Sequence, residues 1–134
     1  MTLLLEAPLF PPGSWLAAAQ LFFALAIGHA VADFPLQGDF LATCKNRRYL
    51  RSLNDPSRPP AMWLPCMAAH CLIHAGVVWV LTGSCLLAVA ELVIHWTLDW
   101  VKCEGRTTFV QDQALHYLSK IAYVIAGCAG FAAA

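Results

Sequence analysis

The sequence predicts an all-α, four-span transmembrane helical bundle in up-down-up-down order, with both termini on the non-cytoplasmic side. Three observations support this fold class: the composition, four long apolar stretches, and the placement of the basic residues. Of the 134 residues, 60% are hydrophobic and 12% are charged, and the mean hydropathy is +0.63. Soluble globular domains carry about twice that share of charged residues. We therefore expect a single integral membrane domain over residues 1–134.

Four stretches are long and apolar enough to cross a bilayer as helices, which takes about 20 mostly apolar residues each. These predicted spans cover about residues 15–34, 62–83, 84–101 and 111–134. Pro35 ends the first span because proline cannot continue a helix. The second and third spans are joined by a tight turn around Gly83, which makes them neighbours in the bundle.

Seven of the eight basic residues lie in two connections, at 35–61 and 102–110. Because cytoplasmic loops carry an excess of Lys and Arg, both connections are expected in the cytoplasm. The formal net charge is zero, so nothing indicates a nucleic-acid partner, and membrane lipid is the expected partner. Gly127 and Gly130 in the last span would allow close helix packing between copies, as in a homo-oligomer.

Every histidine belongs to a pair of ionisable residues spaced four apart. The pairs are His29/Asp33, His70/His74, His95/Asp99 and Asp112/His116. Positions i and i+4 lie on one face of a helix, one turn apart, so the two side chains can share a ligand. In the predicted bundle all four pairs fall in the cytoplasmic half. One histidine of each pair then lies in a deeper layer, formed by His29, His74, His95 and His116.

Ionisable groups inside a bilayer persist where they are paired, bound to metal or facing water. Imidazole and carboxylate are ligands for zinc, manganese and iron. We therefore expect one or two divalent metal ions, with zinc favoured over manganese or iron. The eight paired residues are expected either to bind the ions or to surround them. The six cysteines form no CxxC pair, which argues against a Cys-rich site. Glu91 is either a further ligand or a partner of a neighbouring helix, and Gln113 either reaches the site or caps its helix.

The paired residues also carry a resemblance to a known family. The segment GHAVADFPLQ at 28–37 resembles the opening motif of the domain of unknown function 3307 family of small bacterial and phage membrane proteins. HCLIH at 70–74, HWTLD at 95–99 with Lys102, and DQALH at 112–116 continue the resemblance. It implies an integral protein of the bacterial inner (cytoplasmic) membrane. A looser similarity to membrane-bound metal-dependent hydrolases implies a metal-dependent reaction.

These observations favour a metal-dependent hydrolase that acts at the cytoplasmic leaflet on a lipid-linked or phosphorylated substrate. A metal ion lowers the pKa of bound water, and a nearby carboxylate takes the proton. Asp99 and Asp112 are the expected bases, and Lys102 is expected to stabilise a phosphate. One alternative is a metal-ion or proton conduit, although the outer halves of the spans carry almost no polar residues. Another is a metal-stabilised structural or partner-binding membrane subunit.

Overall fold

The computed structural model describes residues 10–130, and within this range the chain is all-helical. Its long helices are α1 (Trp15–Asp33), α4 (Trp63–Thr82), α5 (Cys85–Cys103) and α6 (Phe109–Cys128). Shorter elements, α2 (Gly38–Cys44), α3 (Arg47–Leu53) and the 3₁₀ turn η1 (Pro60–Met62), lie between α1 and α4. The end of the predicted last span, at 131–134, lies outside the described residues.

Polar side chains fix where the helices begin. Ser14 and Ser84 accept hydrogen bonds from backbone N–H groups in the first turns of α1 and α5. At the start of α6, Thr108 and Gln111 form a reciprocal capping box. Gly83 ends α4 in the left-handed conformation, at a φ of 69° that favours glycine. These caps replace the hydrogen-bond partners that the terminal backbone groups lack.

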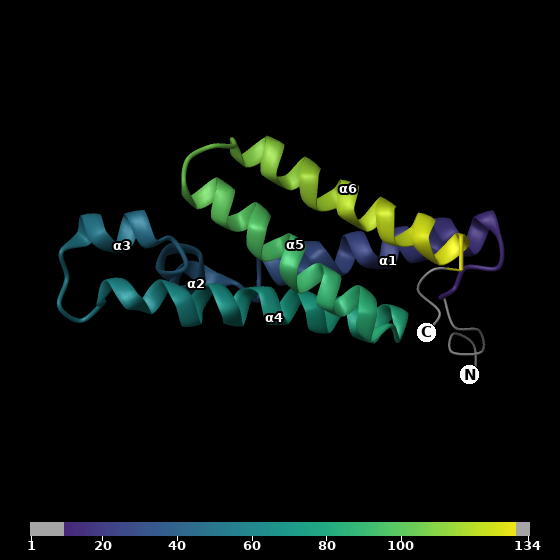
Figure 1. Ribbon diagram of the computed structural model, residues 1–134, viewed down its shortest axis with the longest axis horizontal. Coiled ribbons are helices and arrows are strands. Elements are labelled where there is room, and N and C mark those ends of the chain that lie inside the picture. The colour runs from purple at the N-terminus through teal and green to yellow at the C-terminus, as the bar shows by residue number, and fades with distance from the viewer. Residues whose placement is uncertain (1–9, 131–134) are drawn as a thin grey trace.

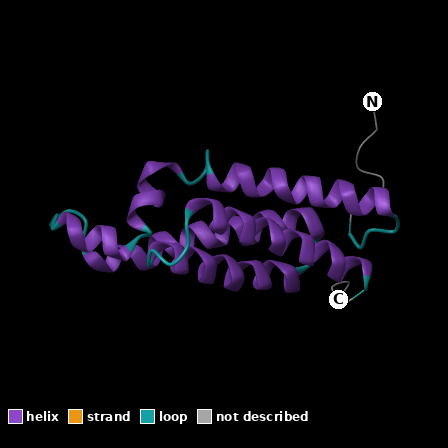
Figure 2. Cartoon of the chain, turned by 90° about the horizontal axis from the view of Figure 1, so that it is seen from above, coloured by secondary structure: helices purple, strands orange, loops and turns teal. Residues whose placement is uncertain are grey.

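The four long helices form an antiparallel bundle in the order α1, α4, α5, α6. Helix α4 packs against α1 and α5, and α6 packs against α5 and α1. The segment with α2 and α3 and the α5–α6 connection lie at the same end of the bundle, which we call the loop end (Figure 1). The start of α1 and the end of α6 lie at the opposite end, which we call the terminal end. The view from above shows the same long axis (Figure 2).

Large apolar side chains project outward from every long helix. The most exposed include Trp15 and Phe23 of α1, Trp79 and Val80 of α4, Val93 of α5, and Val110 and Ile125 of α6. All five histidines, in contrast, are buried. The bundle therefore encloses the histidines together with apolar clusters and presents many large apolar side chains on its surface.

Two of the described helices are long and apolar enough to cross a membrane: Trp15–Asp33, and Pro60–Thr82, which includes η1 and α4. Helices α5 and α6 carry more charge, including Glu91, Asp99 and Lys120. The all-helical fold class is thus confirmed, whereas four spans and the orientation of the termini stay predictions.

The connection predicted as a loop at 35–61 contains two helices that fold back onto α4. Asn46 caps α3 by accepting hydrogen bonds from Arg48 and Tyr49. A small apolar cluster of Cys44, Leu50 and Cys66 lies beneath this segment. As a result the junction between α2 and α3 is held against the loop end of the bundle.

A second apolar cluster fills the terminal end, where Phe10, Leu21, Leu25, Val78, Leu87 and Tyr123 pack together. Phe10 also lies directly against Gly127, where an added Cβ would collide with its ring. Gly127 therefore serves packing within the chain. Self-association of the protein stays a prediction.

Candidate metal centre

All eight paired side chains converge in the loop-end half of the bundle, one pair from each long helix. Seven of the eight are buried, and Asp33 is half-buried. The helical spacing brings the partners of a pair together: His29 Nε2 lies 3.6 Å from Asp33 Oδ2, and His116 Nε2 lies 3.5 Å from Asp112 Oδ1. The predicted convergence is therefore present in the structure. The role of these residues as ligands or catalysts stays a prediction.

Four imidazole rings form the deeper layer that the sequence predicts. The ring centroids of His74 and His95 are 3.6 Å apart, and those of His95 and His116 are 4.1 Å apart. His29 closes the group, with its centroid 5.0 Å from those of both His74 and His116. So close a packing of imidazoles gives the site many nitrogen ligands but few hydrogen-bond partners.

Several buried polar atoms of the centre accordingly have no hydrogen-bond partner. They are Nδ1 of His29 and His70, Nε2 of His74, both ring nitrogens of His116, and both carboxylate oxygens of Asp112, of which Oδ2 is ion-paired with Lys102. A buried polar atom without a partner is costly, about 1–3 kcal/mol each. A cation bound among them would satisfy lone pairs that the protein leaves open.

One group of four side chains could hold a metal ion, because its ligand atoms all lie within 4.8 Å of one another: Asp33, His70, His74 and His95. Asp33 Oδ1 lies 3.4 Å from His70 Nε2 and 3.3 Å from His74 Nε2. The Nε2 atoms of His70 and His95 are 3.0 Å apart. Ligands about 2.0–2.1 Å from a tetrahedral zinc ion lie about 3.3 Å from one another. We call these four residues the primary group.

Two further groups could also hold a metal ion. His29, His95 and His116 form one, and Asp99, Asp112 and His116 form the other. We call the latter the secondary group. It is buried and lies next to the primary group, because His70 Nε2 is 3.2 Å from Asp99 Oδ2. The eight predicted residues thus lie in overlapping groups.

The eight paired residues and Glu91 together form the candidate metal centre, which contains four carboxylates. Lysine side chains pair with three of them. Lys120 donates to both oxygens of Glu91, at 2.6 and 2.7 Å. Lys45 Nζ donates to Asp99 Oδ2, and Lys102 Nζ lies 2.9 Å from Asp112 Oδ2. Asp33 has no lysine partner among the described residues and instead accepts a hydrogen bond from Gln113 Nε2 at 2.7 Å. Asp33 is therefore the carboxylate whose charge a metal ion would neutralise.

Glu91 links the centre to a buried network one turn deeper. Its Oε1 accepts a hydrogen bond from His95 Nδ1 at 3.1 Å, which leaves Nε2 of that ring facing His70. Tyr123 Oη donates to the other oxygen at 2.8 Å. A carboxylate that fixes the tautomer of a ligating histidine is a common feature of metal sites. Of the two interpretations of Glu91 from sequence, the structure supports the role of partner to a neighbouring helix.

Lys45, Lys120 and Tyr123 were missed as members of the centre. The position of Lys120 could have indicated its place in the centre, because it lies one turn after His116 and is the single Lys or Arg after residue 106. No sequence pattern places Lys45 in the centre, since it reaches Asp99 only because the α2–α3 segment folds back onto the bundle. Gln113 was predicted either to reach the site or to cap its helix, and it reaches the site, within 3.3 Å of His29 Nε2.

Charged side chains from the α2–α3 segment fasten it to the end of α5. Arg47 Nε donates to Glu104 Oε1 at 2.7 Å, and Arg48 donates to the Glu104 carbonyl at 2.6 Å. The hydrogen bond from Arg47 lowers the pKa of Glu104. Burial raises the pKa of the nearby Cys103 thiol to about 11, so this cysteine stays a thiol at neutral pH.

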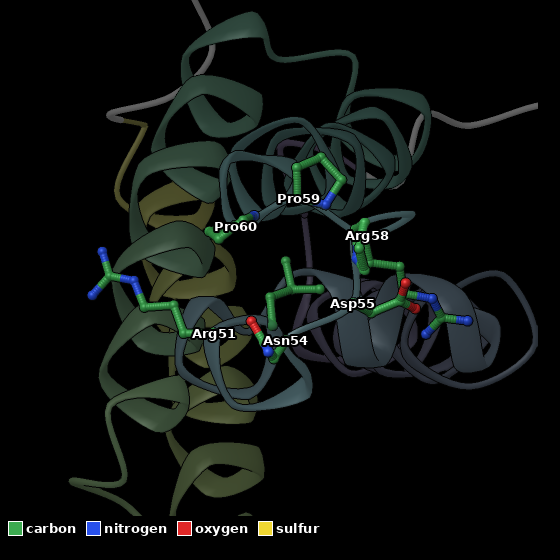
Figure 3. Close-up of a pocket in the computed structure, with 8 residues that line it drawn as sticks. Arg51, Asn54, Asp55, Arg58, Pro59 and Pro60 are labelled. Carbon is green, nitrogen blue, oxygen red and sulfur yellow. The ribbon is translucent and has the colours of Figure 1, made fainter.

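A separate pocket of about 250 Å³ lies where the chain passes from α3 to η1 (Figure 3). It is lined by Leu50, Arg51, Asn54, Asp55, Pro56, Arg58, Pro59 and Pro60. None of these residues belongs to the centre. The pocket is therefore a feature of the α3–η1 connection, with arginines on either side of it.

Comparison with known proteins gives a family but no function. The family model described as "Protein of unknown function (DUF3307)" matches residues 21–131, which include the four pairs and all three lysines of the centre. No curated protein and no solved structure matches the chain. The chain belongs to the DUF3307 family.

Proposed function

We propose that this chain is an integral membrane protein that binds a divalent transition-metal ion in the primary group and uses it for hydrolysis. The observation that carries the metal site is the closeness of the ligand atoms of Asp33, His70, His74 and His95, of which three separations, at 3.0–3.4 Å, are close to the edge of a tetrahedron around zinc. Manganese and iron bind the same ligand types, and nitrogen-rich sites favour zinc over both.

The membrane location is supported by the distribution of side chains over the bundle surface. Exposed apolar residues on all four long helices would face lipid, while the charged groups are enclosed. The basic connections at the loop end would lie in the cytoplasm by the positive-inside rule. The metal centre would then lie in the cytoplasmic half of the bilayer, and the α2–α3 segment would lie at the headgroups.

Hydrolysis is supported by the ionisable groups that surround the primary group. A purely structural ion needs four ligands, yet this centre also buries His116 between Asp99 and Asp112, with its Nε2 3.6 and 3.5 Å from their oxygens. Burying such groups in a membrane is costly and usually reflects function. The bound ion would make a water more acidic if that water joined the four protein ligands, as happens in the zinc sites that expand to five ligands in the transition state.

The chain's own residues would then move the proton and stabilise the product. His116 has two ring nitrogens free of hydrogen bonds and can take a proton, with Asp99 and Asp112 stabilising its charged form. Lys102, at the loop end, would release Asp112 to hold a phosphate on a lipid-linked or phosphorylated substrate. Its side chain is 29% exposed, so it is the member of the centre that a substrate at the headgroups would meet.

A second candidate function is a metal-stabilised membrane subunit, because the four protein ligands would complete a tetrahedral shell. A conduit has less support. An ion path would need polar groups along the whole bundle, whereas the terminal end is filled by Leu21, Leu25, Val78 and Leu87.

The test is elemental analysis of protein purified in detergent without chelators, together with an assay on a phosphate-monoester lipid in mixed micelles. The wild type should carry stoichiometric metal and release phosphate, and His74→Ala should lose both. Asp99→Ala should keep the metal but lose activity. Asp39→Ala, an exposed carboxylate of α2, is the matched control and should change neither.

Wild-type protein without stoichiometric metal would overturn the metal site. Metal-loaded protein whose thermal stability falls in His74→Ala, but which shows no activity, would favour the structural subunit.

A further inference from the structure

The secondary group has the ligands of a metal site, but lysines occupy its carboxylates. Asp99, Asp112 and His116 are buried, and one ligand atom from each lies within 4.8 Å of the others. Lys45 donates to Asp99, and Lys102 pairs with Asp112. Two cationic groups therefore already lie where a second divalent ion would bind.

The net charge of the whole centre limits how many divalent ions it can bind. Asp33, Glu91, Asp99 and Asp112 supply four negative charges, and three lysines supply three positive ones, so the centre carries one net negative charge when its histidines are neutral. One divalent ion changes this to one net positive charge. A second ion beside the lysines would raise it to three, which is strongly unfavourable in a buried site.

Both lysines enter the centre from the loop end, where Lys45 is buried and Lys102 is half-buried. Lys102 is the second-last residue of α5, and its Nζ also lies 4.9 Å from the ring centroid of Phe109. Lys45 follows the last residue of α2, in the segment that folds back onto the bundle. Long lysine side chains near the end of a span readily extend to the headgroups. Lys120, in contrast, is bound deep in the bundle between Glu91 and Ser119.

We propose that Asp99, Asp112 and His116 form a second divalent-cation site, which Lys45 and Lys102 keep closed by holding its two carboxylates. The inference rests on the proposed function, because it takes the primary group as the site of the first ion. In the resting protein the centre binds one ion, and His116 is free to take a proton. When an anionic group at the headgroups draws both lysines away, the centre binds a second ion next to the first, and His116 is then a ligand of that ion and no longer the proton acceptor.

The test is a measurement of metal stoichiometry in Lys45→Gln/Lys102→Gln protein. Loss of two positive charges lets two divalent ions give the same net charge that one ion gives in the wild type. Detergent-purified protein is equilibrated with Zn²⁺, passed through a desalting column and analysed for bound metal. The wild type should hold one ion per chain and the double variant two. Adding His116→Ala to the double variant should return the ratio to one.

Arg51→Gln/Arg58→Gln is the matched control, because it removes two positive charges at the pocket of Figure 3, away from the centre. It should hold one ion. Electron paramagnetic resonance with Mn²⁺ gives an independent readout: the Lys45→Gln/Lys102→Gln protein should show two coupled ions, and the wild type an isolated one. Lys102→Gln alone, at the half-exposed position, should gain the second ion at higher Mn²⁺ concentration if the double variant does not fold.

Two ions in the wild type, or one ion in every lysine variant, would overturn this inference and leave the primary site intact. No ion in the wild type would instead overturn the proposed function.

Discussion

The two halves of the bundle use the same helices to bury opposite kinds of side chain. Toward the loop end, α1 and α4 contribute His29 and His74 to a charged, hydrogen-bonded centre. One turn toward the terminal end the same helices contribute Leu25 and Val78 to an apolar cluster. In a membrane both halves face lipid on the outside, so the difference lies only in the interior. In the proposed function, the terminal half holds the helices together and the loop-end half carries the chemistry.

The largest loss in the free energy of unfolding is expected when a charge is left unpaired in the polar half. Glu91→Leu removes the partner of Lys120 and of the Tyr123 hydroxyl. Breaking a buried ion pair typically destabilises by about 3–5 kcal/mol. We expect a loss of that size in the free energy of unfolding, measured by denaturant titration in detergent. The double variant Glu91→Leu/Lys120→Met should recover most of it, and equal losses in both variants would argue against the pair.

A cavity in the apolar half should lower stability without affecting metal. Leu25 is 1% exposed and lies in the terminal cluster, one turn from His29. Leu25→Ala should reduce the free energy of unfolding by about 2 kcal/mol, at the low end for buried leucines, because lipid weakens the hydrophobic contribution. Bound metal per chain should equal that of the wild type. Loss of metal in this variant would mean that the two halves are not separate in function.

Gly28 lies at the boundary between the halves, where α1 and α4 approach closely. A Cβ at this position would collide with the side chain of Val77 on α4. Gly28→Ala should therefore push the helices apart and destabilise by about 1 kcal/mol. Because His29 is the next residue, the variant should also bind Zn²⁺ more weakly, measured by competition with a chromophoric chelator. Wild-type affinity would show that the centre tolerates a shift of α1.

The smallest effect is expected at the half-buried contact between Arg47 and Glu104. The hydrogen bond from Arg47 lowers the pKa of Glu104 below its ordinary value of 4.5. A lowered carboxyl pKa adds stability that is present above the ordinary value and is lost as the pH falls through the folded-state value. Stability curves measured below pH 4.5 should thus fall less steeply in Glu104→Gln than in the wild type. Parallel curves would show that the contact is absent in solution.

The convergence of the four pairs could be predicted because it depends on local geometry. A spacing of four fixes two side chains on one helix face, and the reversed order of Asp and His on the last pair matches an antiparallel helix. The bounds of α1 and α4 follow from equally local signals, such as Pro35 and the turn at Gly83. What could be derived from spacing was the convergence of the eight paired side chains, but not the lysines and Tyr123 that join them.

Which carboxylates of the centre pair with lysines could not be predicted, because these pairs join distant parts of the chain. Lys45 is 54 positions from Asp99, and Lys120 is 29 positions from Glu91. No periodicity links such residues. Without these contacts, Asp33 cannot be distinguished from Asp99 or Asp112 as the carboxylate that lacks a lysine.

The central claim, that one metal ion is held by three histidines and one aspartate, is tested most directly by X-ray absorption spectroscopy of zinc-loaded protein. A zinc ion in the primary group should show four nitrogen or oxygen ligands at about 2.0–2.1 Å, with multiple scattering from three imidazoles. Asp33→Ala should lose the ion or exchange one ligand, whereas the exposed Asp39→Ala should give the wild-type spectrum. A sulfur ligand at about 2.3 Å, or a first shell with a single imidazole, would contradict the assignment.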